Sequence, residues 1–154
     1  MRTEDVSRLE LLCRRFSGVE LIDLVDDVGG LTPGQAWAHV VSMESKPSLV
    51  VRDKHMADAG RSWWSLAREH GVLSDTSSCL ISVSGLALGA WARIRLPERA
   101  PVFEVFAVDA GSPEFIALNE AGSFFLAVTA EEDETWIYLV ERQGGQLRTL
   151  PAAH

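Results

Sequence analysis

The chain has 154 residues, 47% of them hydrophobic and 23% charged, without repeats, low-complexity segments or linkers, so we expect one globular domain spanning residues 1–154. No apolar run approaches the roughly 18 residues of a membrane helix, and the acidic start MRTEDVSRLELL is unlike a signal peptide. We therefore expect a cytoplasmic protein that makes no membrane contact. The net charge of −8 argues against a nucleic-acid partner.

The N-terminal part of the chain contains three helix-start signals. Thr3 can cap a first helix, whose apolar residues recur at helical spacing. Ser17 and Glu20 match a capping box, which predicts a second helix ended by the glycines at 29–30. The run Thr-Pro-Gly-Gln at 32–35 combines a cap, a proline at the first helical position and a glutamine at the third. These signals predict a layer of short helices.

The middle of the chain mixes helical and extended patterns. Residues 48–52 are a short strand candidate, and residues 57–70 have one apolar face at helical spacing, with Gly71 as a stop. Two further strands are expected at 79–84 and 91–96, the second with alternating faces.

The stretch from Val102 to Leu150 predicts an antiparallel meander, because runs rich in Val, Ile, Phe, Trp and Tyr alternate with short turn-rich breaks. Helices come first and strands later, so we expect an α+β fold with three to four short N-terminal helices on one face of an antiparallel sheet of five to seven strands. Residues 1–71 would be mainly helical and residues 79–150 mainly β. The expected meander strands are 102–109, 114–120, 124–130, 135–142 and 146–150.

Aromatic residues fall on both faces of this meander. Because one face must meet the helices, the other would keep Trp136, Tyr138 or Phe125 partly available. The adjacent pair Trp63 and Trp64 allows two interpretations. Either Trp64 is partly exposed at a protein contact, or the helix lies between two layers that cover both indole rings.

Negative charge is concentrated in the meander. Residues 1–100 contain 12 Lys/Arg and 13 Asp/Glu, whereas residues 101–154 contain 2 and 9. Glu131, Glu132, Asp133 and Glu134 form a turn that lacks the ligand spacing and the glycine of a calcium loop. Two interpretations stay open for this turn: a docking point for Lys or Arg of another protein, and a solvated hairpin tip that discourages edge aggregation.

Known catalytic and metal-binding motifs are absent from the sequence, so we expect no catalytic residue, metal or cofactor. Cys13 and Cys79 are expected to be buried free thiols. The nearest approach to a catalytic cluster is Asp53 and His55 with Asp58, which His39 and His70 would have to join through the fold. The strand face with Trp91, Arg93 and Arg95 could stack on nucleic acid, but pairing of these arginines with Glu104 or other acidic residues of the last third is favoured.

These observations favour a non-enzymatic protein-binding module, a monomer or homodimer, that presents an acidic, aromatic-bearing β surface to a basic protein. A bacterial immunity or antitoxin-type inhibitor, an acidic adaptor or a secretion chaperone would have this character. The alternative is a small enzyme or ligand-binding domain with a pocket around His55 and Asp53, to which His39 and Glu104 could contribute. A third hypothesis is a structural subunit that associates through apolar contacts. The expected partner-binding residues are Glu131, Glu132, Asp133, Glu134, Trp136, Tyr138 and Trp64.

Overall fold

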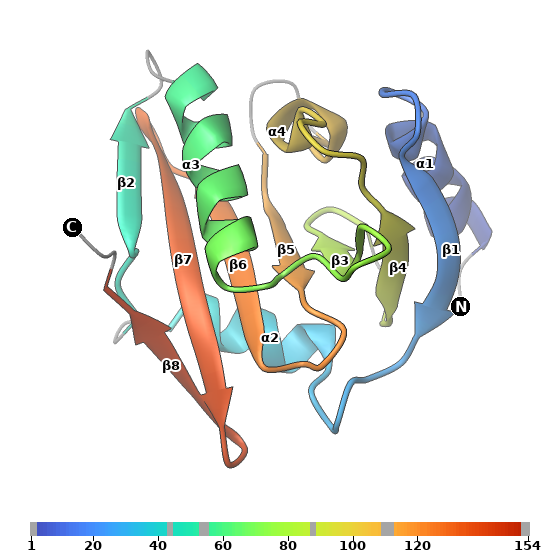
Figure 1. Ribbon diagram of the computed structural model, residues 1–154. Helices are drawn as coiled ribbons and strands as arrows, with labels where there is room; N and C mark the ends of the chain where they lie inside the picture. Colours follow the sequence, from blue (N-terminus) through green and yellow to red (C-terminus); the bar gives the residue numbers. More distant parts are fainter. Residues whose placement is uncertain (1–2, 43–44, 53–55, 87–88, 109–112, 152–154) are drawn as a thin grey trace.

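The computed structural model describes residues 3–42, 45–52, 56–86, 89–108 and 113–151 (Figure 1). This part of the chain forms four helices and eight strands. The helices are α1 (Thr3–Cys13), α2 (Pro33–Val40), α3 (Met56–Glu69) and α4 (Val102–Val105). The strands are β1 (Glu20–Val25), β2 (Leu49–Arg52), β3 (Ser78–Val83), β4 (Trp91–Arg95), β5 (Phe115–Leu118), β6 (Phe124–Ala130), β7 (Glu134–Gln143) and β8 (Gln146–Leu150). None of the described helices is long and apolar enough to cross a membrane.

All described strands belong to one antiparallel sheet in the order β1-β4-β3-β5-β6-β7-β2. The ten-residue strand β7 pairs with β2 along its first half and with β8 along its second half. The α+β class and the β5–β8 meander are therefore confirmed. The sheet has eight strands in place of the five to seven expected.

Helices cover both faces of the sheet, which corrects the expectation of a single helical layer. Trp63 of α3 and Leu9 of α1 belong to the core on one face, together with residues of α4. Ala36 and Val40 of α2 pack on the opposite face, so that α3 and α2 lie on different sides of the sheet in Figure 1. The inner strands fit this arrangement, because every residue of β5 is buried and none alternates with a solvent-facing position.

The segment predicted as the second helix is the edge strand β1. A bulge at Ile22 explains why it resembled a helix: Leu21 pairs with Ile94 and Leu24 pairs with Ala92, so both leucines face the same core despite their spacing of three. Gly18, with φ +95, lies where the second helix would have begun. Residues 1–71 thus contain the strand β1 in addition to the three helices α1, α2 and α3 and the expected short strand β2.

The first run of the predicted meander is also different, because Val102–Val105 forms the short helix α4. Three of its four residues and the following Phe106 are buried, so the run showed no strand alternation to distinguish it from a helix. Arg15 stabilises this segment by donating to the carbonyl oxygens of Glu104 at 2.8 Å and Ala107 at 2.6 Å. The remaining predicted elements are confirmed, including the capping box in which Thr32 and Gln35 exchange hydrogen bonds.

The turn between β5 and β6 requires glycine at position 122. Gly122 has φ +73, and a Cβ atom there would lie 2.8 Å from Val28 Cγ1. We expect Gly122→Ala to lower the free energy of unfolding by about 1–3 kcal/mol, measured by urea denaturation. Gly144→Ala is the matched control, because Gly144 also has a positive φ, of +55, but apart from its chain neighbours no atom of the described residues lies within 4 Å of the added Cβ. Equal losses in the two variants would show that the Val28 contact has no effect.

Candidate functional site

The four acidic residues predicted as a docking point form the turn between β6 and β7. The amide of Glu131 donates to the carbonyl oxygen of Glu134 at 2.8 Å and closes this turn. The side chains of Glu131, Glu132 and Asp133 are exposed. None of these three carboxylates forms an ion pair with a cation in the described part of the chain. The turn therefore presents negative charge that the described residues do not neutralise.

Two apolar side chains accompany this turn on one face of the sheet. Trp136 is half-buried, and its indole Nε1 donates to Glu134 Oε1 at 3.1 Å. Val50 lies opposite Trp136 in the β2–β7 register and is 44% exposed. Since β2 is the last strand on this side of the sheet path, both residues lie near its boundary. We call residues 131–134, Trp136 and Val50 together the acidic edge.

Two of the predicted partner-binding aromatic residues are not accessible. Tyr138 is only 4% exposed and lies with Phe125 in the core beneath α2. This burial raises the pKa of the Tyr138 phenol. Trp64 is 7% exposed because α3 lies between the sheet and residues 97–108, and its Nε1 donates to the carbonyl oxygen of Ala100 at 3.0 Å. The prediction that Tyr138 is available is wrong, and the sandwiched-helix interpretation holds for Trp64.

The two histidines that the structure describes, His39 and His70, do not form the cluster that a catalytic site would need. Asp53 and His55 lie outside the described residues. The ring of His70 packs on the ring of Phe124, with centroids 5.5 Å apart, on the face of the sheet that α3 covers. His39 belongs to α2, on the other face, and lines a hollow of about 670 Å³ beside β8. The structure therefore separates His39 from His70.

A chain of polar contacts holds His39 in place. Its Nε2 lies 2.9 Å from Thr149 Oγ1, which in turn lies 2.9 Å from Ser45 Oγ. Burial lowers the pKa of His39 below its ordinary value of 6.5. The unfolded chain consequently binds a proton here more readily than the folded chain does, so this contribution to stability is present above pH 6.5 and is lost as the pH falls toward the folded-state pKa.

His39→Gln should therefore make stability less dependent on pH in this range. We expect the free energy of unfolding of the unmodified chain to decline more steeply between pH 7 and pH 5 than that of the variant, because only the former carries this imidazole. Urea denaturation at several pH values measures the two slopes. Parallel slopes would show that His39 does not contribute to acid sensitivity.

The arginines of β4 form ion pairs, as the sequence indicated, and one partner of Arg93, Glu120, belongs to the acidic last third of the chain. Arg93 contacts Asp23 at 2.6 Å and Glu120 at 2.9 Å, and Arg95 lies 3.8 Å from Glu20. The hydrogen bonds to these carboxylates raise the pKa of Arg93. Glu104 is exposed and takes no part in these pairs. The charges of this strand face are thus largely satisfied within the chain.

Both cysteines are buried free thiols, as expected. Burial raises the pKa of Cys13 to about 11 and that of Cys79 to about 12, so neither is a reactive thiolate near neutral pH. Within the described residues, no group of three or more His, Cys, Asp and Glu is arranged to hold a metal ion.

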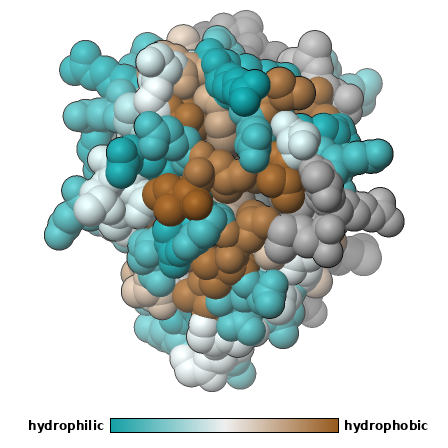
Figure 2. Space-filling model, turned by 90° about the vertical axis from the view of Figure 1, so that its right-hand side faces the viewer, coloured by the Kyte–Doolittle hydropathy of each residue, from teal (hydrophilic) through white to brown (hydrophobic). Residues whose placement is uncertain are grey.

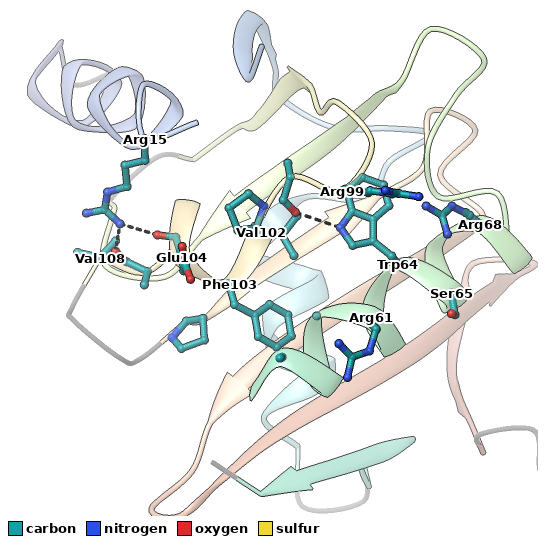
Figure 3. A pocket seen from close by; sticks show the side chains of 16 residues that line it. Arg15, Arg61, Trp64, Ser65, Arg68, Arg99, Val102, Phe103, Glu104 and Val108 are labelled. Carbon is teal, nitrogen blue, oxygen red and sulfur yellow. Dashed lines mark hydrogen bonds between the residues drawn. The ribbon is translucent and has the colours of Figure 1, made fainter. Parts of the chain in front are cut away.

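Sequence reasoning missed a groove of about 1190 Å³ between α3 and residues 99–108. Figure 3 shows Trp64 at one end, close to Arg68 and Arg99, and Arg15 with Glu104 and Val108 at the other. In the sequence, the apolar residues of this groove cannot be distinguished from ordinary core residues. The arginines around it come from α3 and from two separate loops, so no sequence motif joins them. Its charged lining residues are Arg15, Arg61, Arg68, Arg99 and Glu104.

The side of the molecule that carries α1 and β1 has exposed apolar residues. Figure 2 shows hydrophobic side chains gathered across the middle of this face, with hydrophilic side chains around them. Leu11 of α1 and Ile22 at the bulge of β1 are 60% and 48% exposed. This surface is the feature that the structural-subunit hypothesis would use.

Comparison with known proteins gives no further guide: the sequence matches no protein-family model, no curated protein and no solved structure. The function is therefore inferred from the chemistry of the chain's own surface. Its two most distinctive features carry opposite charge, the acidic edge beside β2 and the arginine-lined groove beside α3.

Proposed function

We propose that this chain is a non-enzymatic protein-binding module that docks a basic protein on its acidic edge. A bacterial immunity or antitoxin-type inhibitor, or an acidic adaptor, would act in this way. The observation that carries the proposal is the composition of that edge. Three exposed carboxylates without an ion-pair partner among the described residues lie beside a half-buried tryptophan and an exposed valine.

Each part of the acidic edge has a physical role in such binding. The carboxylates of Glu131, Glu132 and Asp133 would steer a cationic partner toward the turn and speed its association. Trp136 would supply the apolar anchor, and its hydrogen bond to Glu134 holds the ring in place before the partner arrives. With Tyr138 and Phe125 buried beneath α2, Trp136 and Val50 supply the apolar contacts beside the acidic turn.

Capture from a lysate of the native host tests the proposal. The immobilised protein should retain a basic protein at low salt and release it at high salt, because ionic strength screens exposed charges. A variant with Glu131→Gln, Glu132→Gln and Asp133→Asn should not retain it. The matched control removes three exposed charges elsewhere, with Glu10→Gln, Asp26→Asn and Glu69→Gln, and should retain it. Equal capture by all three proteins would contradict docking at the acidic edge.

The alternative of a ligand pocket around His55 and Asp53 concerns residues outside the described part of the chain. The large groove that the structure does show is lined by residues of α3 and of 99–108, among them Glu104. This groove is a candidate site separate from the acidic edge, and its variants are independent of those that test the edge.

A further inference from the structure

The geometry points to a second binding site in the groove between α3 and residues 99–108, one that takes an anionic amphiphile. Such a ligand combines one apolar chain with one anionic headgroup. The apolar chain would lie along the groove over Phe103 and Val108, and the headgroup would lie near Trp64, between Arg68 and Arg99 (Figure 3). Four kinds of observation support this assignment: the volume of the groove, the contacts that fix its walls, the charge of its lining residues and the backbone conformation of Arg99.

The groove has the size and lining of a ligand site. Its volume of about 1190 Å³ slightly exceeds the roughly 300–1,000 Å³ of ordinary small-molecule pockets, which leaves room for an extended chain. The helix α3 contributes Gly60, and apart from the backbone of this helix and the chain neighbours of Gly60, no atom of the described residues lies within 4 Å of the position that a Cβ would take there. The space beside this helical turn is consequently open to a ligand.

Both walls of the groove are tied to the rest of the molecule. Trp64 is held by its hydrogen bond to the carbonyl oxygen of Ala100, and it packs edge-on against Trp63 with ring centroids 5.3 Å apart. At the far end, Arg15 binds the carbonyl oxygens of Glu104 and Ala107. Phe103 rests on Phe115 of the sheet at a ring distance of 6.1 Å. A pre-formed groove of this kind loses little conformational freedom when a ligand binds.

The charge of the lining is opposite to that of the whole chain. Four arginines and one glutamate line the groove in a protein of net charge −8. Arg61 pairs with Asp58, and Arg68 pairs with Glu98 at 2.6 Å while its guanidinium lies 5.5 Å from the centre of the Trp64 ring. Arg99 makes no hydrogen bond or ion pair with any residue that the structure describes. Positive charge therefore remains at the Trp64 end, where an anionic headgroup would be attracted.

The backbone of Arg99 is strained, which separates it from an ordinary surface arginine. The amide of Ala100 donates to the carbonyl oxygen of Pro97, and Arg99, at the third position of this turn, has φ +67. Glycine or asparagine is the usual residue in this conformation, because a larger side chain costs free energy there. Strain of this kind is typical of functional sites, and here it places an unpaired guanidinium at the rim of the groove.

Isothermal titration calorimetry with dodecanoate tests the site. The unmodified protein should bind dodecanoate below its micelle-forming concentration with a Kd in the micromolar range. Acetate, which lacks the chain, and dodecyltrimethylammonium, which carries the opposite charge, should not bind. A parallel titration with dodecyl phosphate distinguishes a phosphate headgroup from a carboxylate headgroup. Binding of either anion supports the site, and the anion that binds more tightly identifies the preferred headgroup.

Two variants test separately the contribution of the arginine charge and that of the open volume of the groove. Arg99→Asn removes the guanidinium at a position where asparagine tolerates the backbone, and it should weaken dodecanoate binding about tenfold or more. Gly60→Leu fills the groove and should abolish binding, while folding improves because glycine is unfavourable inside a helix. The matched controls are Arg14→Gln, an exposed arginine outside the groove lining, and Gly60→Ala, which leaves most of the space open.

Several results would overturn the site. Dodecanoate binding that survives Gly60→Leu would place the ligand elsewhere, and equal binding of dodecyltrimethylammonium would show apolar contact without charge recognition. Failure of both anionic amphiphiles to bind, together with binding of an acidic peptide or a concentration-dependent dimer that Gly60→Leu disrupts, would assign the groove to a protein. Neutralising residues 131–133 should leave dodecanoate binding unchanged, so this test is independent of the acidic edge.

Discussion

Replacing Phe115 with alanine should lower the free energy of unfolding by about 3–5 kcal/mol, the usual cost of deleting a buried phenyl ring. Phe115 is completely buried on β5, between β3 and β6. Its ring lies 5.3 Å from that of Phe106 and 6.1 Å from those of Trp63 and Phe103. One ring therefore joins α3, α4 and the sheet, and its removal would leave a cavity where these elements meet. Urea denaturation measures the loss.

The size of this loss matters because a domain is stable by only about 5–15 kcal/mol. Phe16→Ala is the matched control, because Phe16 is 36% exposed and the same deletion should cost less than about 1 kcal/mol there. Comparable losses in the two variants would show that the aromatic cluster around Phe115 is not a principal part of the core. Because Phe103 rests on Phe115, the floor of the groove should also loosen in Phe115→Ala.

Reversing the charge of the acidic edge should slow association with its basic partner by about 10–1,000-fold at low salt. The variant combines Glu131→Lys, Glu132→Lys and Asp133→Lys, and leaves Glu134 in place because that carboxylate accepts the hydrogen bond of Trp136. Exposed charges act mainly on the approach of the partner, so the dissociation rate should change little. Stopped-flow or surface-binding kinetics with the captured partner measure both rates.

Trp136→Ala provides the complementary measurement. It removes the apolar anchor and leaves the carboxylates, so it should accelerate dissociation by about 30-fold, the equivalent of about 2 kcal/mol for a central aromatic contact. Association should be nearly unchanged. If the lysine variant binds at the original rate, the carboxylates do not steer the partner, and the solvated-hairpin interpretation of the turn holds instead.

Local sequence signals predicted the elements that depend on them. The capping box of Thr32 and Gln35 defined the start of α2, and the alternating runs of β6 and β7 defined the meander within about two residues. The elements that were wrong depend on tertiary contacts. The bulge at Ile22 gives β1 the apolar spacing of a helix, and the burial of Val102, Phe103 and Val105 makes α4 resemble a strand.

The candidate sites also divide into features that local sequence predicts and features that depend on tertiary contacts. The carboxylates of residues 131–134 are adjacent in sequence, so the acidic turn was recognisable. Which aromatic residues accompany it was not, because α2 crosses to the other face of the sheet and buries Tyr138. The groove could not be predicted from the sequence. Trp64 and Arg99 meet only because the turn at 97–100 packs on α3. The backbone conformation of Arg99 also has no sequence signal.

Hydrogen exchange of the protein with and without its captured basic partner tests the central claim most directly. Amide protection should rise in residues 129–137 and in β2, where the acidic edge lies, and should stay unchanged in α3 and residues 97–108. Protection confined to α3 and residues 97–108, with none at the acidic edge, would contradict the assignment of that edge as the docking site.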